Sequence, residues 1–141
     1  MRIARILTRL NLGGPARQVL ASDPLLIERG HVLRVFVGTP EVGEGDLFED
    51  LANSGVDAVR VPHLSRGVSP VRDFSALRFL RRELRAFGPD IVHTHASKSG
   101  SLGRKAARGI QRVATDGTNV PVGTVHTFHG HVLEGYFSPL I

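Results

Sequence analysis

The chain alternates short, mostly apolar runs with longer stretches in which apolar residues recur at helical spacing. The short runs predict β-strands, and the longer stretches predict helices. The predicted strands cover residues 2–8, 31–39, 56–64, 90–95 and 120–128. The predicted helices cover residues 15–30, 45–55, 73–88 and 98–110. Strands and helices therefore follow one another in strict alternation along the whole sequence.

This alternation is typical of an α/β fold, because parallel strands need crossover helices to connect them. We expect a Rossmann-like parallel sheet with helices on both faces. The chain contains no internal repeat and no linker, so residues 1–141 are predicted to form one domain. In such a sheet, ligands bind at the loops that follow the carboxyl ends of the strands.

Three local features refine the predicted elements. Pro24 removes one hydrogen bond from the first helix and is expected to kink or divide it. Asp73 is a candidate N-cap of the third helix, which should end at Gly88. Residues 112–119 are polar and precede the last strand, so we expect a mobile loop or an insertion there.

The formal net charge of +5 comes almost wholly from arginine, since Lys98 and Lys105 are the only lysines. Such a charge fits nucleic acid, anionic lipid or a phosphate-bearing substrate. The arginines are scattered and lack interleaved aromatic residues, so we expect no nucleic-acid partner. Four of them share one face of the third predicted helix, which is either a solvated face or a contact for anionic lipid headgroups: Arg78, Arg81, Arg82 and Arg85.

No apolar run approaches the roughly 20 residues that cross a bilayer, and the first residues do not resemble a signal peptide. The sequence thus predicts a cytoplasmic protein. It contains no cysteine, which excludes disulfides and thiolate ligands. Any metal ion would have to be held by histidine, aspartate or glutamate.

Histidines gather at the ends of two predicted strands. His93 and His95 lie two residues apart at the end of one strand, and His129 and His131 follow the last strand. Side chains two residues apart on a strand point the same way, so either pair can face one metal ion. No carboxylate accompanies the pairs at ligand spacing, which disfavours a metal site. A catalytic site, ordinary buried histidines and a histidine-ligated metallohydrolase remain open.

Gly13 and Gly14 follow the first strand and open the first helix, where backbone N–H groups can bind an anion. A plain tight turn is the alternative. The glycine spacing does not match the dinucleotide-binding fingerprint. The glycines, Arg66, the segment from His95 to Lys98, and His129 are all predicted to lie at the carboxyl end of the sheet.

Five stretches together closely resemble the amino-terminal half of the family 4 retaining glycosyltransferases of the GT-B fold. The stretches are "RILTRLNLGGPARQVL", "RGH", "GDLFEDLANSGV", "VPHLSRGVSPVRDFSALRFLRRELRAFGPDIVHTHASKSGSLGR" and "VHTFHGHVLEGYFSP". The resemblance implies one half of a two-domain architecture, in which this domain supplies most of the acceptor site and a second domain binds the donor. It also implies transfer of a hexosyl group, with retention, from a nucleotide diphosphate sugar to a glycan or lipid-linked acceptor, as in the synthesis of cell-envelope polysaccharides.

The resemblance also implies roles for individual residues. Gly13 and Gly14 would face the donor diphosphate, and His129 would be the catalytic residue beside the transferred sugar. The remaining rim residues would border acceptor and donor: His93, His95, Lys98, Ser99, Arg66 and His131. The family needs neither metal ion nor cofactor, because protein cations and helix dipoles stabilise the leaving diphosphate. Peripheral contact with the inner face of the membrane would suit a lipid-linked acceptor.

The sequence departs from the family in one respect that bears on function. It stops at Ile141, where the family's donor-binding half would follow, so that half is absent from residues 1–141. We therefore expect the 141-residue chain alone to be inactive. The alternative is a lone Rossmann-like binding module, or a subunit of a split enzyme whose partner chain carries the missing domain.

Overall fold

A computed structural model describes residues 1–130. His131 lies outside these residues, as do four apolar residues that the sequence predicts to be partly exposed: Val132, Leu133, Tyr136 and Phe137. Within residues 1–130, the main sheet has five parallel strands in the order β3-β2-β1-β4-β7. Its strands are β1 (Arg2–Leu7), β2 (Val32–Val37), β3 (Asp57–Arg60), β4 (Ile91–His95) and β7 (Gly123–Thr127).

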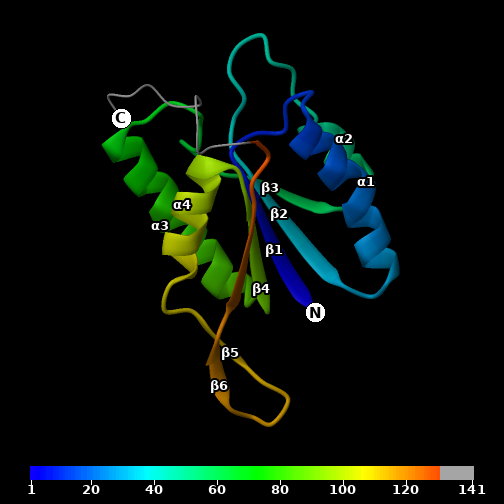
Figure 1. Cartoon of the computed structure of the whole chain (residues 1–141), viewed down its shortest axis with the longest axis vertical. Helices are drawn as coiled ribbons and strands as arrows, with labels where there is room; N and C mark the ends of the chain where they lie inside the picture. Colours follow the sequence, from blue (N-terminus) through cyan, green and yellow to red (C-terminus); the bar gives the residue numbers. More distant parts are fainter. Residues whose placement is uncertain (131–141) are drawn as a thin grey trace.

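In the described part of the chain, four helices cover the two faces of this sheet. They are α1 (Gly14–Glu28), α2 (Phe48–Asn53), α3 (Pro70–Phe87) and α4 (Ser97–Ala107). Figure 1 shows α1 and α2 on one side of the sheet and α3 and α4 on the other. The strand order reverses direction at β1, as it does in a doubly wound sheet. The Rossmann-like fold predicted from the alternation is therefore confirmed.

Alternating side chains of the strands pack into two apolar clusters, one on each face of the sheet. One cluster joins Ala4, Ile6 and Val92 to Leu80 and Leu84 of α3. The other joins strand residues to α1 and α2: Leu7, Val35 and Val37 pack with Ala16, Val19 and Leu51. A side chain on every second strand residue points to the same face, so the strand pattern alone divides the core into these two layers.

Glycine lets α4 approach the sheet closely. A Cβ atom on Gly103 would lie 2.5 Å from Cγ2 of Thr94 and 2.9 Å from Cδ1 of Ile6. A Cβ atom on Gly100 would lie 2.5 Å from Cε1 of His126. Larger residues at these two positions would push the helix away from β4 and β7. The glycine pair thus fixes the position of α4 against the strands that carry the histidines.

The structure corrects three of the predicted elements. The first helix is continuous from Gly14 to Glu28, so Pro24 neither ends nor divides it. The third helix begins earlier than expected, with Ser69 rather than Asp73 at its N-cap and Pro70 in its first turn. Gly88 ends it in a left-handed conformation with φ of 62°, as predicted.

The third correction concerns the polar stretch before the last strand. Instead of a mobile loop, residues 111–121 form an antiparallel hairpin of β5 (Gln111–Val113) and β6 (Asn119–Pro121). The Asp116-Gly117 pair lies in its turn, where Gly117 has a φ of 82°. The hairpin projects from the end of the sheet opposite to the carboxyl ends of the strands (Figure 1).

Candidate functional site

The loops at the carboxyl ends of the strands are joined to one another by hydrogen bonds. The backbone N–H of Ser99 donates to Oγ1 of Thr8, 3.3 Å away. The backbone N–H of Ala96 donates to the carbonyl of Thr127, 3.2 Å away. Nζ of Lys98 donates to the carbonyl of Gly67 in the loop that follows β3. We call this edge of the sheet the rim. Gly13, Gly14, Arg66, Lys98 and His129 lie on it, whereas His93 lies further inside the sheet, in register with Arg5.

The amino-terminal end of α1 lies on the rim without a side-chain cap. Gly13 occupies the N-cap position and makes no side-chain capping bond, and Pro15 has no N–H to donate. A Cβ atom on Gly14 would meet no atom within 4 Å, so the surface is open at this point. The free backbone N–H groups and the helix dipole favour a negatively charged group here.

His95 lies buried at the end of β4 and links three other side chains. Its Nδ1 lies 2.7 Å from Nε2 of His129, which is exposed on the rim. Its Nε2 lies 3.5 Å from Nη1 of Arg5 on β1. His93 stacks on the same imidazole, with ring centroids 4.2 Å apart, and its Nε2 lies 2.8 Å from Oγ1 of Thr127. The predicted gathering of His93, His95 and His129 is therefore observed.

A buried ion pair lies beside His93, His95 and His129, which we call the row of histidines. Nη2 of Arg5 lies 2.9 Å from Oδ1 of Asp23, and both side chains are buried between β1 and α1. Sequence reasoning missed this pair. Its signal was the charged Arg5 between two inward-facing apolar positions of the first strand, Ile3 and Leu7. Thr127, the partner of His93, was also missed.

The environment of the histidines favours their neutral forms. Burial, together with the neighbouring His93 and Arg5, lowers the pKa of His95 to about 3. Burial and the charge of Arg5 lower the pKa of His93 to about 4. Partial burial also lowers the pKa of His129 from its ordinary value. At neutral pH the row consists of uncharged imidazoles, each with one donor and one acceptor nitrogen.

A ligand can reach three polar residues of this region to different degrees: Lys98 and Ser99 of α4, and Arg66 of the loop after β3. Nζ of Lys98 lies 2.7 Å from Oδ1 of Asp73, so its charge already has a partner. Ser99 is buried and its hydroxyl donates to the carbonyl of His95, so this hydroxyl already has a partner within the chain. Arg66 is exposed in the loop after β3.

The turn between β4 and α4 is strained. Ala96 has a φ of 63° and a ψ of 173°, a conformation that residues with a side chain rarely adopt. This turn directs His95 inward and starts α4 at Ser97 on the rim. Backbone strain of this kind is concentrated at functional sites, where the surrounding contacts maintain it.

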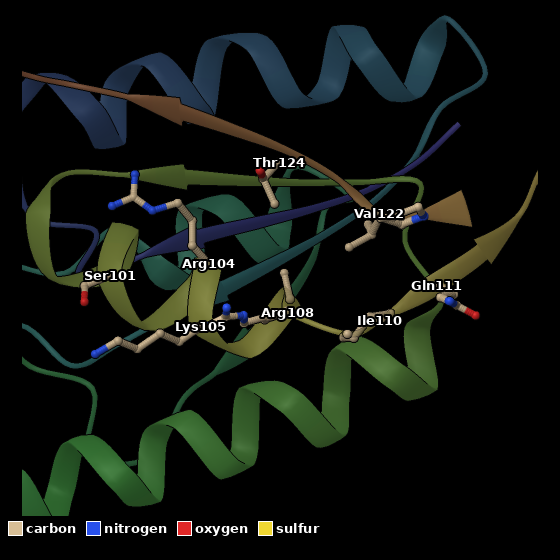
Figure 2. Close-up of a pocket in the computed structure, with 11 residues that line it drawn as sticks. Ser101, Arg104, Lys105, Arg108, Ile110, Gln111, Val122 and Thr124 are labelled. Atoms are coloured by element: carbon tan, nitrogen blue, oxygen red, sulfur yellow. The ribbon is translucent and has the colours of Figure 1, made fainter. Parts of the chain in front are cut away.

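The described histidines do not form a metal cluster, and a pocket lies away from them. Within residues 1–130, no group of three or more histidines, cysteines, aspartates or glutamates is placed to hold a metal ion. A pocket of about 550 Å³ lies elsewhere, between α4, the hairpin and the start of β7 (Figure 2). Arg104, Lys105 and Arg108 line it together with apolar residues such as Ile110 and Val122.

The basic face predicted on α3 is only partly a free surface. Arg78, Arg82 and Arg85 are exposed. Nη2 of Arg81 instead lies 3.3 Å from the carbonyl of Lys105 and 3.4 Å from that of Arg108, so it satisfies the last turn of α4. No helix among the described residues is long and apolar enough to cross a membrane.

Comparison with known proteins identifies the family of the chain. The model of Glycosyltransferase Family 4 matches residues 12–140. A UDP-Gal:alpha-D-GlcNAc-diphosphoundecaprenol alpha-1,3-galactosyltransferase of Escherichia coli is 41% identical over 91 residues, which are 64% of this chain and 21% of the relative. The matched segment thus spans about a fifth of that relative's length. Since the family model covers nearly all of the chain, the protein belongs to glycosyltransferase family 4.

Proposed function

We propose that the chain is the amino-terminal, acceptor-side domain of a retaining glycosyltransferase with the GT-B architecture. In this proposal a second domain, or a partner chain, binds a nucleotide diphosphate sugar and faces the rim. The complete enzyme transfers a hexosyl group to a glycan or lipid-linked acceptor. Gly13 and Gly14 face the donor diphosphate, His129 contacts the transferred sugar, and Arg66 and Lys98 border the two substrates.

The observation that carries the proposal is the combination of polar groups on an open surface. The uncapped amino-terminal end of α1 and the exposed ring of His129 both lie on the rim. Glycosyl transfer needs the two substrates aligned and water excluded, which requires a second surface opposite this one. A two-domain enzyme supplies that surface.

The finer points of the proposal rest on the relative. Its name describes a UDP-galactose donor, an acceptor linked to diphosphoundecaprenol and an alpha-1,3 product. Retention is supported by this linkage, since a donor with an alpha-linked sugar gives an alpha product only if the configuration is retained. We therefore choose UDP-galactose and a lipid diphosphate acceptor carrying GlcNAc as the first substrates to test.

The test uses the complete protein that contains this chain. It is incubated with these substrates, and with other nucleotide sugars in parallel, and the product's anomeric configuration is determined by NMR. We expect an alpha-linked product, and at least a tenfold loss of kcat/KM in His129→Ala. His31→Ala, at the opposite end of the sheet, is the matched control. A beta-linked product from an alpha-linked donor contradicts retention, and transfer that appears only with an added second chain identifies a split enzyme.

Peripheral membrane contact is the second part of the proposal. Besides the exposed basic residues of α3, Arg104 and Lys105 of α4 and Arg108 just after it are also exposed, and α4 packs against α3. Three large apolar side chains are exposed where α3 begins: Val68, Val71 and Phe74. Basic side chains contribute about 1 kcal/mol each near an anionic bilayer, and exposed apolar side chains add to this by insertion.

Vesicle co-sedimentation at low salt tests this contact. We expect binding to vesicles that contain anionic phosphatidylglycerol and little binding to neutral vesicles. The variant Arg78→Gln/Arg82→Gln/Arg85→Gln should weaken binding by at least tenfold. The control Arg17→Gln/Arg29→Gln, on α1 and just after it, removes two positive charges where the first variant removes three, and it should bind almost like the wild type. Equal binding to anionic and neutral vesicles contradicts the proposal.

A further inference from the structure

A chain of two hydrogen bonds runs from Arg5 through His95 to His129, and the side chain of Arg5 can only donate. A guanidinium group has five N–H donors and no acceptor. The contact of Arg5 Nη1 with Nε2 of His95 therefore requires the lone pair of that nitrogen. A neutral imidazole with its lone pair on Nε2 carries its proton on Nδ1. Arg5 thus selects the Nδ1–H tautomer of His95.

The same reasoning applies to the next pair in the row. Nδ1–H of His95 donates to Nε2 of His129 over 2.7 Å. The two ring planes are nearly parallel, at 18°, with centroids 5.0 Å apart, so the N–H can point along the plane toward the lone pair. Since Nε2 of His129 accepts this bond, the proton of His129 lies on Nδ1. That nitrogen belongs to the exposed ring on the rim.

We propose that the buried Arg5–Asp23 pair acts through His95 to fix His129 as a neutral hydrogen-bond donor, with its Nδ1–H available to substrate. This inference rests on the proposed function for the identity of the substrate only. The group that His129 recognises is an oxygen acceptor, such as a sugar hydroxyl or a phosphate oxygen. His129 serves neither as a base nor as a nucleophile, because one nitrogen carries the proton and the other accepts from His95.

Charging His129 would disrupt the whole row. A proton on its Nε2 would face Nδ1–H of His95, and reversing His95 would bring its Nε2–H against Arg5. Four other groups set the charge around the His95–His129 pair: Arg5 on β1, Asp23 on α1, His93 on β4 and His126 on β7. Asp23 is the single carboxylate among them, and it binds Arg5. Arg5 and Asp23 are positioning residues, since neither reaches the rim.

The test is made on the 141-residue chain without substrate, so its result does not depend on the proposed enzymatic activity. Long-range 1H–15N correlation spectra of protein labelled at the histidine ring nitrogens distinguish Nδ1–H from Nε2–H. At pH 7.5 we expect both His95 and His129 to carry their proton on Nδ1, which is the less populated tautomer of free histidine. Nε2–H as the main form of either residue overturns the proposal.

Two nearly isosteric substitutions of His95 provide the matched comparison. In His95→Gln, the amide can accept from Arg5 and donate to Nε2 of His129, so His129 should keep its Nδ1–H form. In His95→Glu, the carboxylate can only accept, so His129 should move its proton to Nε2, and its pKa should rise by at least one unit. Equal spectra of His129 in the two variants overturn the proposal. If either variant fails to fold, the wild-type tautomers decide the question alone.

Discussion

The two faces of the sheet differ in what the same strands bury there. Toward α3 and α4, β1 and β4 present Ala4, Ile6 and Val92 to an almost purely apolar cluster. Toward α1, the neighbouring positions of the same strands carry Arg5, His93 and His95. Buried polar groups cost free energy unless they are paired, and the ion pair adds no stability that apolar residues would not supply. Both faces therefore bury apolar residues that hold the fold together, and the face toward α1 also holds the histidines in place.

Breaking the ion pair should have the largest effect on stability. In Arg5→Leu the carboxylate of Asp23 stays buried without its partner, which should lower the free energy of unfolding by about 3–5 kcal/mol. The variant Arg5→Leu/Asp23→Leu should lie within about 1 kcal/mol of the wild type, because it buries no charge. Urea denaturation measures both values. Equal losses in the single and double variants would contradict the view that the pair serves position rather than stability.

A truncation on the apolar face should cost stability without touching the histidines. Leu80 is fully buried in the cluster between α3 and the sheet. Leu80→Ala should lower the free energy of unfolding by about 3 kcal/mol, from lost burial and the cavity left behind. Its histidine ring nitrogens should keep their wild-type NMR signals. A shifted His129 signal in this variant would show that the two faces are coupled.

Acidification should affect one face alone. His95 and His93 have pKa values of about 3 and about 4 in the folded chain, below the 6.5 of an unfolded histidine. Between pH 6.5 and 4 the unfolded chain binds more protons, so stability should fall as the pH falls, by on the order of 3 kcal/mol for each of the two histidines.

Urea denaturation at several pH values checks this slope. His93→Gln/His95→Gln should flatten it, because the two titrating groups are gone. Leu80→Ala should shift the whole curve downward and keep the slope of the wild type. A wild-type stability that does not change between pH 7 and pH 4.5 would show that these histidines are not held neutral by the fold.

The smallest effect concerns the open end of α1. UDP should bind the 141-residue chain with a Kd in the roughly millimolar range, since a few hydrogen bonds in contact with water yield only about 4 kcal/mol. Gly14→Ala should weaken this binding without changing stability, because its Cβ would meet no atom of the chain. NMR shift titration measures the Kd of UDP for the wild type and for Gly14→Ala. Glu28→Ala, at the far end of the helix, is the control. The same chain, assayed alone, should transfer no sugar.

Much of the fold could be predicted from sequence because each element carries its own periodic signal. The failures arose where a local rule competed with context. Pro24 predicted a kink or a division of the first helix, but the helix is not divided, because the loss of one hydrogen bond does not outweigh the packing of Ala16 and Val19 on the sheet. The polar stretch at 112–119 looked like a loop, although its Asp116-Gly117 pair is a turn signal of β-hairpins.

For the site, sequence could place residues on the rim but could not tell which ones face a ligand. Gly13, His95 and His129 follow strand ends, and that rule located them correctly. Burial depends on packing between elements, so the sequence did not reveal that Ser99 and His95 point inward. The link from Asp23 through Arg5 to His95 joins α1, β1 and β4, and no local pattern in the sequence encodes it.

The hairpin of β5 and β6, at the end of the sheet opposite to the rim, is a suitable place to attach a label. Its turn at residues 115–118 is exposed, and neither the rim nor the row of histidines touches it. Exposed turns of this kind accept inserted peptides with little disturbance of the surrounding backbone. A fluorescent label or an affinity tag grafted between Asp116 and Gly117 would report on, or immobilise, the molecule while leaving the whole substrate-facing edge free for titration and assay.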